Sequence, residues 1–272
     1  MTTLKTVIID ISKLNSADNI EVFTQNMPFE IRIGMSSCDE NGGTFLITDN
    51  RRAADEAISR GIGFSAYKND ENDGFEFPEA LYLVDNLSDM SPENLNRMYL
   101  RANNLPWEIL RTKRTLVREM TVEDVDVLYE IYKDEDVKRY IEDLYADRAE
   151  EIQYTKDYIV NQYRFYEYGM WIVEDIDTGK IIGRAGIFDR PNQQLQEMGF
   201  VFAKEVWGKG IAYEVLDAVI AYAKEELSIE SLYAHVIHEN VRSRKLLEKL
   251  GFNYDGESEL QDKIYDRYIK IN

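Results

Sequence analysis

Two glycines one residue apart, Gly208 and Gly210, stand between an apolar stretch and a helix-forming stretch. The N–H groups of such a bend and of the helix start present hydrogen-bond donors and a partial positive charge to an anion. Glycine also lacks the side chain that would keep a phosphate away from the backbone. The bend therefore predicts a pyrophosphate site, although an ordinary turn explains two glycines as well. The amides that we expect to bind belong to Gly208, Lys209, Gly210, Ile211 and Ala212.

The residues around this bend are similar to a known motif. Residues 207–212 read W-G-K-G-I-A and resemble the [Q/R]-x-x-G-x-[G/A] loop of the GNAT superfamily, with Trp207 in place of Gln or Arg. Further along, Asn240-x-x-Ser243 followed by L-G-F at residues 250–252 is similar to the branch that includes ribosomal-protein N-terminal acetyltransferases. The resemblance covers about residues 112–271.

This resemblance implies an acetyl-CoA-dependent N-acetyltransferase that acts on a primary amine by direct transfer in a ternary complex. In the family, two strands of a mixed, mostly antiparallel sheet splay apart and the pantetheine arm of the cofactor lies between them. Here those strands correspond to residues 200–202, which include Val201 and Phe202, and 232–237. An amide near Val201 would polarise the thioester carbonyl. Lys209, and with it Lys204, would screen the charge of the phosphates, or else both are solvated surface lysines. Asn240 would bind the cofactor, cap its helix, or do both.

The resemblance also suggests catalytic residues. A carboxylate close to the amine can remove the proton that blocks its lone pair, and Glu197 occupies the place of an acidic residue in the family's E-x-G pattern. The alternative for Glu197 is an ion pair with an arginine such as Arg184. Ser243 could donate a proton to the leaving sulfur or simply pack its helix. Leu247 replaces the tyrosine that many members use as the acid, which leaves open a non-catalytic acyl-CoA sensor.

Composition limits the partners. The formal net charge of −19 is spread along the chain, with 9 basic and 18 acidic residues in 1–110 and 23 and 33 in 111–272. Without a basic domain, nucleic-acid binding is disfavoured, whereas a small-molecule or peptide amine is attracted, or the charge serves solubility alone. The sequence contains no membrane-spanning apolar run and no metal-binding cysteine–histidine pattern, and it has a single cysteine, Cys38. We expect a cytoplasmic monomer or homodimer with no membrane partner and no metal.

The pattern of apolar residues predicts an α/β (α+β) chain with two domains. Residues 1–110 alternate strands, at 5–11, 44–48, 62–67 and 80–84, with helices, at 50–60 and from Ser91, as in a small Rossmann-like domain. Residues 111–272 carry the GNAT-like pattern. Its expected strands are 114–119, 170–176, 181–188, 195–202, 231–237 and 264–271, and its expected helices start at Thr121 and span 148–167, 213–227 and 241–250.

The N-terminal half gives a weaker functional signal. Residues 44–61 are faintly similar to the strand, acidic loop and helix of haloacid-dehalogenase-type phosphatases. Those enzymes need an early D-x-D, but Asp10-Ile11-Ser12 lacks the second carboxylate, and Asp49 alone would hold Mg²⁺ weakly. We therefore expect a degenerate, non-catalytic domain that binds a ligand or supports the transferase.

Overall fold

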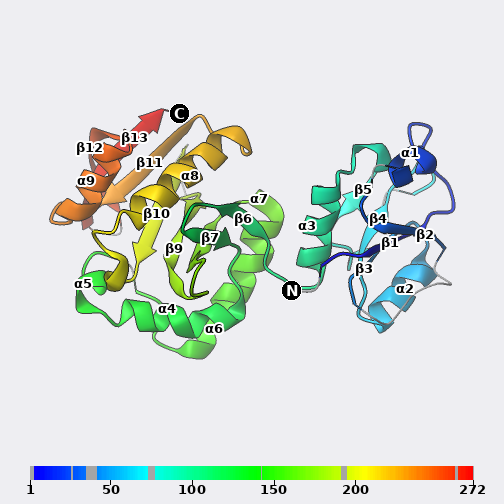
Figure 1. Cartoon of the computed structure of the whole chain (residues 1–272), viewed down its shortest axis with the longest axis horizontal. Helices are drawn as coiled ribbons and strands as arrows, with labels where there is room; N and C mark the ends of the chain where they lie inside the picture. The colour runs from blue at the N-terminus through cyan, green and yellow to red at the C-terminus, as the bar shows by residue number, and fades with distance from the viewer. Residues whose placement is uncertain are drawn as a thin grey trace. The chain divides into compact units, whose positions relative to one another are not determined.

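The computed structural model divides the chain into two compact units, Met1–Trp107 and Glu108–Asn272 (Figure 1). The sequence placed the domain boundary at residue 110, whereas Glu108–Arg111 forms strand β6 of the second unit. Cys38 lies outside the described residues. The structure describes residues 3–25, 27–34, 42–72, 77–141, 143–190, 195–260 and 263–271.

The first unit is built on a five-stranded parallel sheet in the order β2-β1-β3-β4-β5. Its strands are β1 (Thr6–Asp10), β2 (Glu30–Ile33), β3 (Thr44–Thr48), β4 (Gly63–Tyr67) and β5 (Leu83–Val84). Strand β2 was not expected, because its residues are half exposed and show no apolar run. The remaining strands lie within the expected ranges.

Helices cover both faces of this sheet. Alternate side chains of β1 point to opposite faces, so Ile8 packs with α2 (Arg51–Ser59) while Val7 and Ile9 pack with α3 (Pro92–Ala102) and the short α1 (Ile20–Gln25). Asn50 and Ser91 cap the N-termini of α2 and α3 through their side chains.

The second unit contains an eight-stranded sheet in the order β12-β13-β11-β10-β9-β8-β7-β6. Its strands after β6 are β7 (Thr115–Arg118), β8 (Met170–Asp175), β9 (Ile181–Phe188), β10 (Gln196–Phe202), β11 (Ser231–Val236), β12 (Asn253–Leu260) and β13 (Lys263–Ile271). Every described pair is antiparallel except β10 with β11. The mixed, mostly antiparallel sheet expected from the sequence is therefore confirmed, and β6 and β12 extend it at its two edges.

Helices pack on both faces of this sheet as well. Tyr222 of α8 (Ile211–Glu225) meets the buried ring of Trp171 edge-on, with ring centroids 5.6 Å apart, on one face. On the other face Tyr132 of α4 (Val125–Tyr132) contacts Arg184 of β9, and Tyr158 of α6 (Arg148–Tyr158) accepts a hydrogen bond from the Met170 amide of β8. The helices are α4 (Val125–Tyr132), α5 (Glu135–Lys138), α6 (Arg148–Tyr158), α7 (Arg164–Tyr166), α8 (Ile211–Glu225) and α9 (Val241–Lys249), and a π-helical segment (Ile159–Tyr163) joins α6 to α7.

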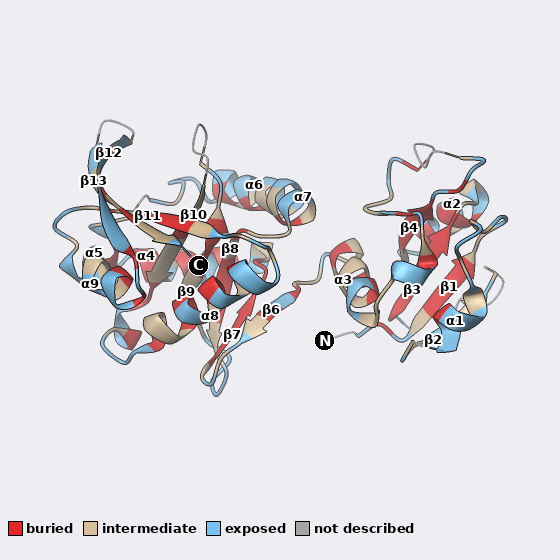
Figure 2. Cartoon of the chain, turned by 90° about the horizontal axis from the view of Figure 1, so that it is seen from above, coloured by how far each residue is buried: buried red, intermediate tan, exposed pale blue. Residues whose placement is uncertain are grey.

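Buried residues concentrate in the strands of each sheet, and exposed residues line the outer faces of the helices (Figure 2). Among the helices that the structure describes, none combines the length and the apolar character needed to cross a bilayer.

Candidate active site

The two parallel strands of the second sheet separate soon after they begin to pair. Within the described residues, β10 and β11 are paired at Gln196↔Leu232 and Glu197↔Tyr233 and at no later position. Strand β10 nevertheless stays paired with β9 as far as Phe202↔Gly183. One side of β10 therefore has unpaired backbone groups beyond Glu197, and such groups are costly unless a ligand or water satisfies them.

Alternation along β10 decides which amides face this gap. The Ala203 amide donates to the Ile182 carbonyl of β9 at 2.9 Å, so the amide of Val201, two residues earlier, also faces β9. The amides of Phe200 and Phe202 then face the gap. The polarising amide that the sequence placed near Val201 is therefore best supplied by one of these neighbours.

The glycine bend lies directly after β10. Gly208 and Gly210 have φ angles of +74° and +77°, which side-chain-bearing residues rarely adopt. Gly210 is the N-cap of α8, and no side chain caps this helix end. Within the described part of the chain, the amides of Gly208, Gly210, Ile211 and Ala212 donate no hydrogen bond that competes with a ligand. The bend thus has the free donors and partial positive charge that a pyrophosphate requires.

Distant residues hold this bend in place. The Trp207 indole N–H donates to the Phe202 carbonyl at 2.9 Å, and Arg242 of α9 lies over the Trp207 ring at 4.7 Å. Arg114 donates to the Lys209 carbonyl at 2.9 Å and forms an ion pair with Glu214 of α8 at 2.7 Å. Trp207 therefore replaces the family's Gln or Arg with a contact that fixes the loop to the strand it leaves.

The two lysines of the loop region differ in their surroundings. Lys209 is exposed beside the free amides, where it can screen a bound phosphate. Lys204 forms ion pairs with Asp136 at 2.6 Å and Asp134 at 3.6 Å. Its charge is already partly balanced, which argues against the phosphate-screening role considered for Lys204.

Helix α9 begins beside the gap. The Asn240 side-chain oxygen accepts a hydrogen bond from the Ser243 amide at 3.2 Å, so Asn240 is the helix cap. Both residues also line the cavity described next. Leu247, in contrast, is fully buried and does not line this cavity, so the position of the family tyrosine contributes no polar group to it.

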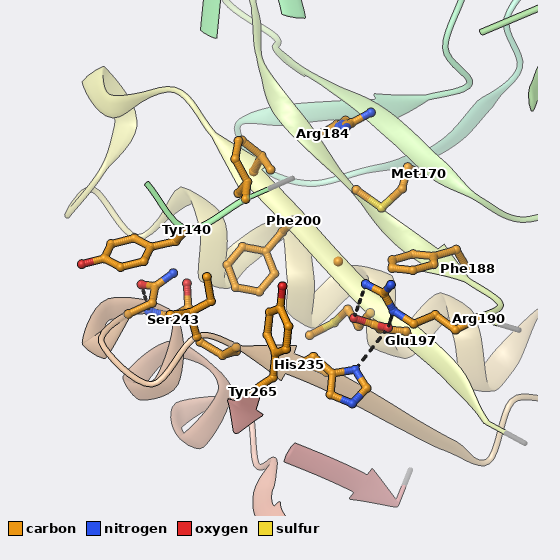
Figure 3. A pocket seen from close by; sticks show the side chains of 18 of the residues that line it. Tyr140, Met170, Arg184, Phe188, Arg190, Glu197, Phe200, His235, Ser243 and Tyr265 are labelled. Atoms are coloured by element: carbon orange, nitrogen blue, oxygen red, sulfur yellow. Dashed lines mark hydrogen bonds and ion pairs between the residues drawn. The ribbon is translucent and has the colours of Figure 1, made fainter. Parts of the chain in front are cut away.

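A cavity of about 470 Å³ opens between β9, β10, β11 and the helices α4 and α6. In Figure 3, Ser243 and Tyr140 lie at one end, Glu197 with Arg190 and His235 lies toward the other, and Phe200 stands between them. The structure thus brings Val201, Asn240 and Ser243 together with Glu197 around one cavity.

Glu197 lies within a buried polar cluster. Its side chain is 5% exposed and pairs with Arg190, not with Arg184 as the sequence suggested. Arg184 instead donates to the Tyr132 hydroxyl at 2.9 Å. His235 Nδ1 lies 3.3 Å from the Glu197 carboxylate, and neither ring nitrogen makes a hydrogen bond with the described residues. An imidazole can both donate and accept a proton, so His235 is placed to exchange a proton with Glu197, directly or through water.

Sequence reasoning missed several residues of this site. Three arginines contact the site from elsewhere in the sequence. Arg190 pairs with Glu197, seven residues away, and Arg114 donates to the carbonyl of Lys209, 95 residues away. Arg242 lies over the ring of Trp207, 35 residues away. Arginines are common on protein surfaces, and no local pattern distinguishes these three. The sequence placed His235 at the end of its strand without a role. Its alternation with Tyr233 on β11 puts both on the face of Glu197, but that contact depends on which strands pair.

Comparisons with known proteins agree with this geometry. Residues 114–253, just over half of the chain, match the family described as Acetyltransferase (GNAT) domain. Among curated proteins, the chain is similar to the "Uncharacterized N-acetyltransferase YoaA" of Bacillus subtilis strain 168. The two are 28% identical over 152 residues, which are 54% of this chain and 84% of the relative.

Solved structures show the same fold. An acetyltransferase from Agrobacterium tumefaciens strain C58 superimposes with a TM-score of 0.53 at 23% identity, over 60% of this chain and 94% of the other. The ribosomal-protein-S5-alanine acetyltransferase of Vibrio fischeri gives a TM-score of 0.52 at 19% identity, over 60% and 96%. At these identities the likeness concerns the fold alone.

Proposed function

This chain belongs to the GNAT acetyltransferase family and transfers an acetyl group to an amine, and from that premise we propose that acetyl-CoA binds along the gap between β10 and β11. The observation that supports this proposal is the continuity of the gap with the bend at Gly208 and Gly210. The free amides of β10 along one side of the gap match a pantetheine arm, and the free amides of the bend at the end of the gap match the pyrophosphate that follows it.

The residues around the cavity suit direct transfer in a ternary complex. Glu197 accepts a proton from the amine, directly or through His235 or water. The Phe200 or Phe202 amide stabilises negative charge on the carbonyl oxygen while the new C–N bond forms and the C–S bond breaks. Ser243 donates a proton to the departing sulfur. The acetyl group supplied by the cosubstrate thereby moves to nitrogen without a covalent enzyme intermediate.

Two measurements test this function. Calorimetry measures the binding of CoA, and a thiol assay measures the release of CoA from acetyl-CoA with a panel of primary amines. We expect CoA binding and amine-dependent thiol release. Binding without turnover on any amine would contradict acetyl transfer and favour an acyl-CoA sensor, the second candidate, which the buried Leu247 in place of the family tyrosine motivates. An absence of CoA binding would contradict both.

Replacing Ser243 with alanine tests the proposed proton donor. We expect kcat to fall by roughly a hundredfold, at the low end of typical general-acid effects, because thiolate departure loses the hydroxyl proposed to donate its proton, while the Asn240 cap, made to the backbone of residue 243, remains. The affinity for CoA should stay unchanged. Ser231→Ala at the start of β11 is a matched control outside the cavity, and equal activity of the two variants would assign Ser243 to helix packing.

The volume of the cavity, about 470 Å³, suits a small molecule as acceptor. A protein N-terminus, as in the ribosomal-protein branch, is the second candidate. Short peptides and free amines in the same assay separate the two possibilities.

For the first unit we propose a non-catalytic role. The Asp49 carboxylate accepts hydrogen bonds from the Ser12 amide and hydroxyl, the Lys13 amide and the Asn69 side chain. These contacts occupy the lone pairs that a metal would need, and the described residues contain no cluster of three or more potential metal ligands. Phosphoester hydrolysis in the presence of Mg²⁺ would contradict this role.

A further inference from the structure

Arg184 is a cationic side chain that lines the cavity without an anionic partner. It extends from β9 and is partly buried. Its Nε donates to the Tyr132 hydroxyl at 2.9 Å, and its guanidinium carbon lies 5.2 Å from the centre of the Tyr132 ring. In the part of the chain that the structure describes, no carboxylate lies within ion-pair distance of Arg184 and its terminal nitrogens make no hydrogen bond.

Two other arginines of this unit, one buried and one partly buried, have carboxylate partners. Arg118 contacts Asp124 at 2.8 Å and Glu174 at 2.6 Å, and Arg190 pairs with Glu197. Removing an arginine from water is costly unless its charge is compensated. The contrast suggests that the anionic partner of Arg184 is not part of this chain.

Nearby carboxylates do not take this place. Asp189 lines the cavity but accepts hydrogen bonds from Tyr168 at 2.7 Å and Gln196 at 3.3 Å. Glu151 attracts Arg184 electrostatically but accepts from the Tyr145 amide and lies beyond ion-pair distance. Burial lowers the pKa of Arg184, but Tyr132, Tyr158 and Glu151 together raise it by more, so the guanidinium stays charged. Among the described residues that line the cavity, Arg184 therefore presents a positive charge that no carboxylate pairs with.

The place of Arg184 in the sheet determines what it can reach. Arg184 is directly opposite Val201 of β10, and the two side chains share the face that bears Glu197. Val201 stands between Phe200 and Phe202, whose amides face the cofactor gap. An anionic group bound to Arg184 would therefore lie close to the amine that receives the acetyl group.

We propose that the acceptor is an amine that carries a carboxylate close to its amino group, such as an α-amino acid, and that Arg184 binds this carboxylate. This inference rests on the proposed function. A guanidinium offers two parallel N–H donors that match the geometry of a carboxylate. The same charge repels an acceptor that bears only ammonium groups, so polyamines should be poor acceptors despite the net negative charge of the chain.

Binding of the reaction product tests this proposal without turnover. N-acetyl amino acids and their C-terminal amides, in pairs with the same side chain, are titrated into CoA-saturated protein by calorimetry. We expect one or more of the acids to bind more tightly than the matching amide, by roughly tenfold or more, because only the carboxylate makes charged hydrogen bonds to the guanidinium. Equal affinity across all pairs, or no binding of any product, would overturn the proposal.

Variants of Arg184 show whether this residue is responsible. Arg184→Gln should remove the difference between acid and amide, and Arg184→Lys should retain part of it, while CoA affinity stays unchanged. Arg148→Gln, which removes an exposed arginine paired with Asp126, is the control. Should Arg184→Gln fail to fold, the Lys variant still decides the matter, because an acid preference equal to that of the wild type would contradict bidentate recognition.

Turnover separates this inference from the proposed function. Thiol release is measured with amino acids, their amides and spermidine. Turnover on several amines with no preference for a carboxylate would keep the transferase function and overturn the role of Arg184. Binding of N-acetyl amino acids through Arg184 without turnover on any amine would keep the role of Arg184 and overturn the transferase function.

Discussion

Replacing Gly210 with aspartate should weaken CoA binding by about a hundredfold. Gly210 caps α8 beside the free amides of Ile211 and Ala212, and a Cβ at this position would meet a single side-chain atom, of Arg114, at 3.8 Å. The new carboxylate would lie where the pyrophosphate is expected. Two like charges about 4 Å apart near a protein surface repel each other by about 4 kcal/mol. Calorimetry with CoA measures the effect.

Gly179→Asp controls for the backbone. Gly179 has a φ of +67°, close to the +77° of Gly210, and lies in the turn between β8 and β9, where a Cβ would meet nothing within 4 Å. Aspartate there carries the same conformational cost and the same charge. The midpoint of thermal unfolding should therefore shift similarly in both variants, while the affinity for CoA falls in Gly210→Asp alone. Equal CoA affinities would show that the bend does not hold the pyrophosphate.

Local sequence signals predicted most of the fold. Ser91-Pro92 at the start of α3 and the Thr121 amide bonded to Asp124 at 2.7 Å are contacts between neighbours in sequence. Long apolar runs such as Thr44–Thr48 are buried along their whole length. Elements that lack such signals were missed, among them β2 and β12, whose residues are largely exposed or half-buried at sheet edges.

The candidate site was predicted where its chemistry depends on the backbone. The bend from Gly208 to Ala212 was recognisable because positive φ angles and helix starts leave a mark in sequence. The partners of Glu197 were not, since Arg190 lies beyond the end of β9 and His235 comes from another strand. Ion pairs depend on which strands become neighbours, and residue type alone gives no choice between Arg184 and Arg190.

Replacing Glu197 with glutamine should lower kcat/KM by roughly 10² to 10³, within the range for general-base catalysis. Glutamine keeps the shape of the side chain and a hydrogen bond to Arg190 but cannot accept the proton of the amine. The ion pair with Arg190 holds the carboxylate in place inside the cavity. His235, 3.3 Å away, offers a route by which the proton can leave.

The pH dependence distinguishes catalysis from structure. Below the pKa of the acceptor, most of the amine is protonated and needs a base, so the loss in Glu197→Gln should be largest there and should shrink as the pH rises. Glu174→Gln is the control. It removes a comparable carboxylate on β8, which pairs with Arg118 and lies outside the cavity. Its thermal unfolding should shift as much as that of Glu197→Gln while its pH–rate profile matches the wild type. If Glu197→Gln also kept the wild-type profile, Glu197 would act only by balancing Arg190, and the base would have to be sought elsewhere in the cavity, first at His235.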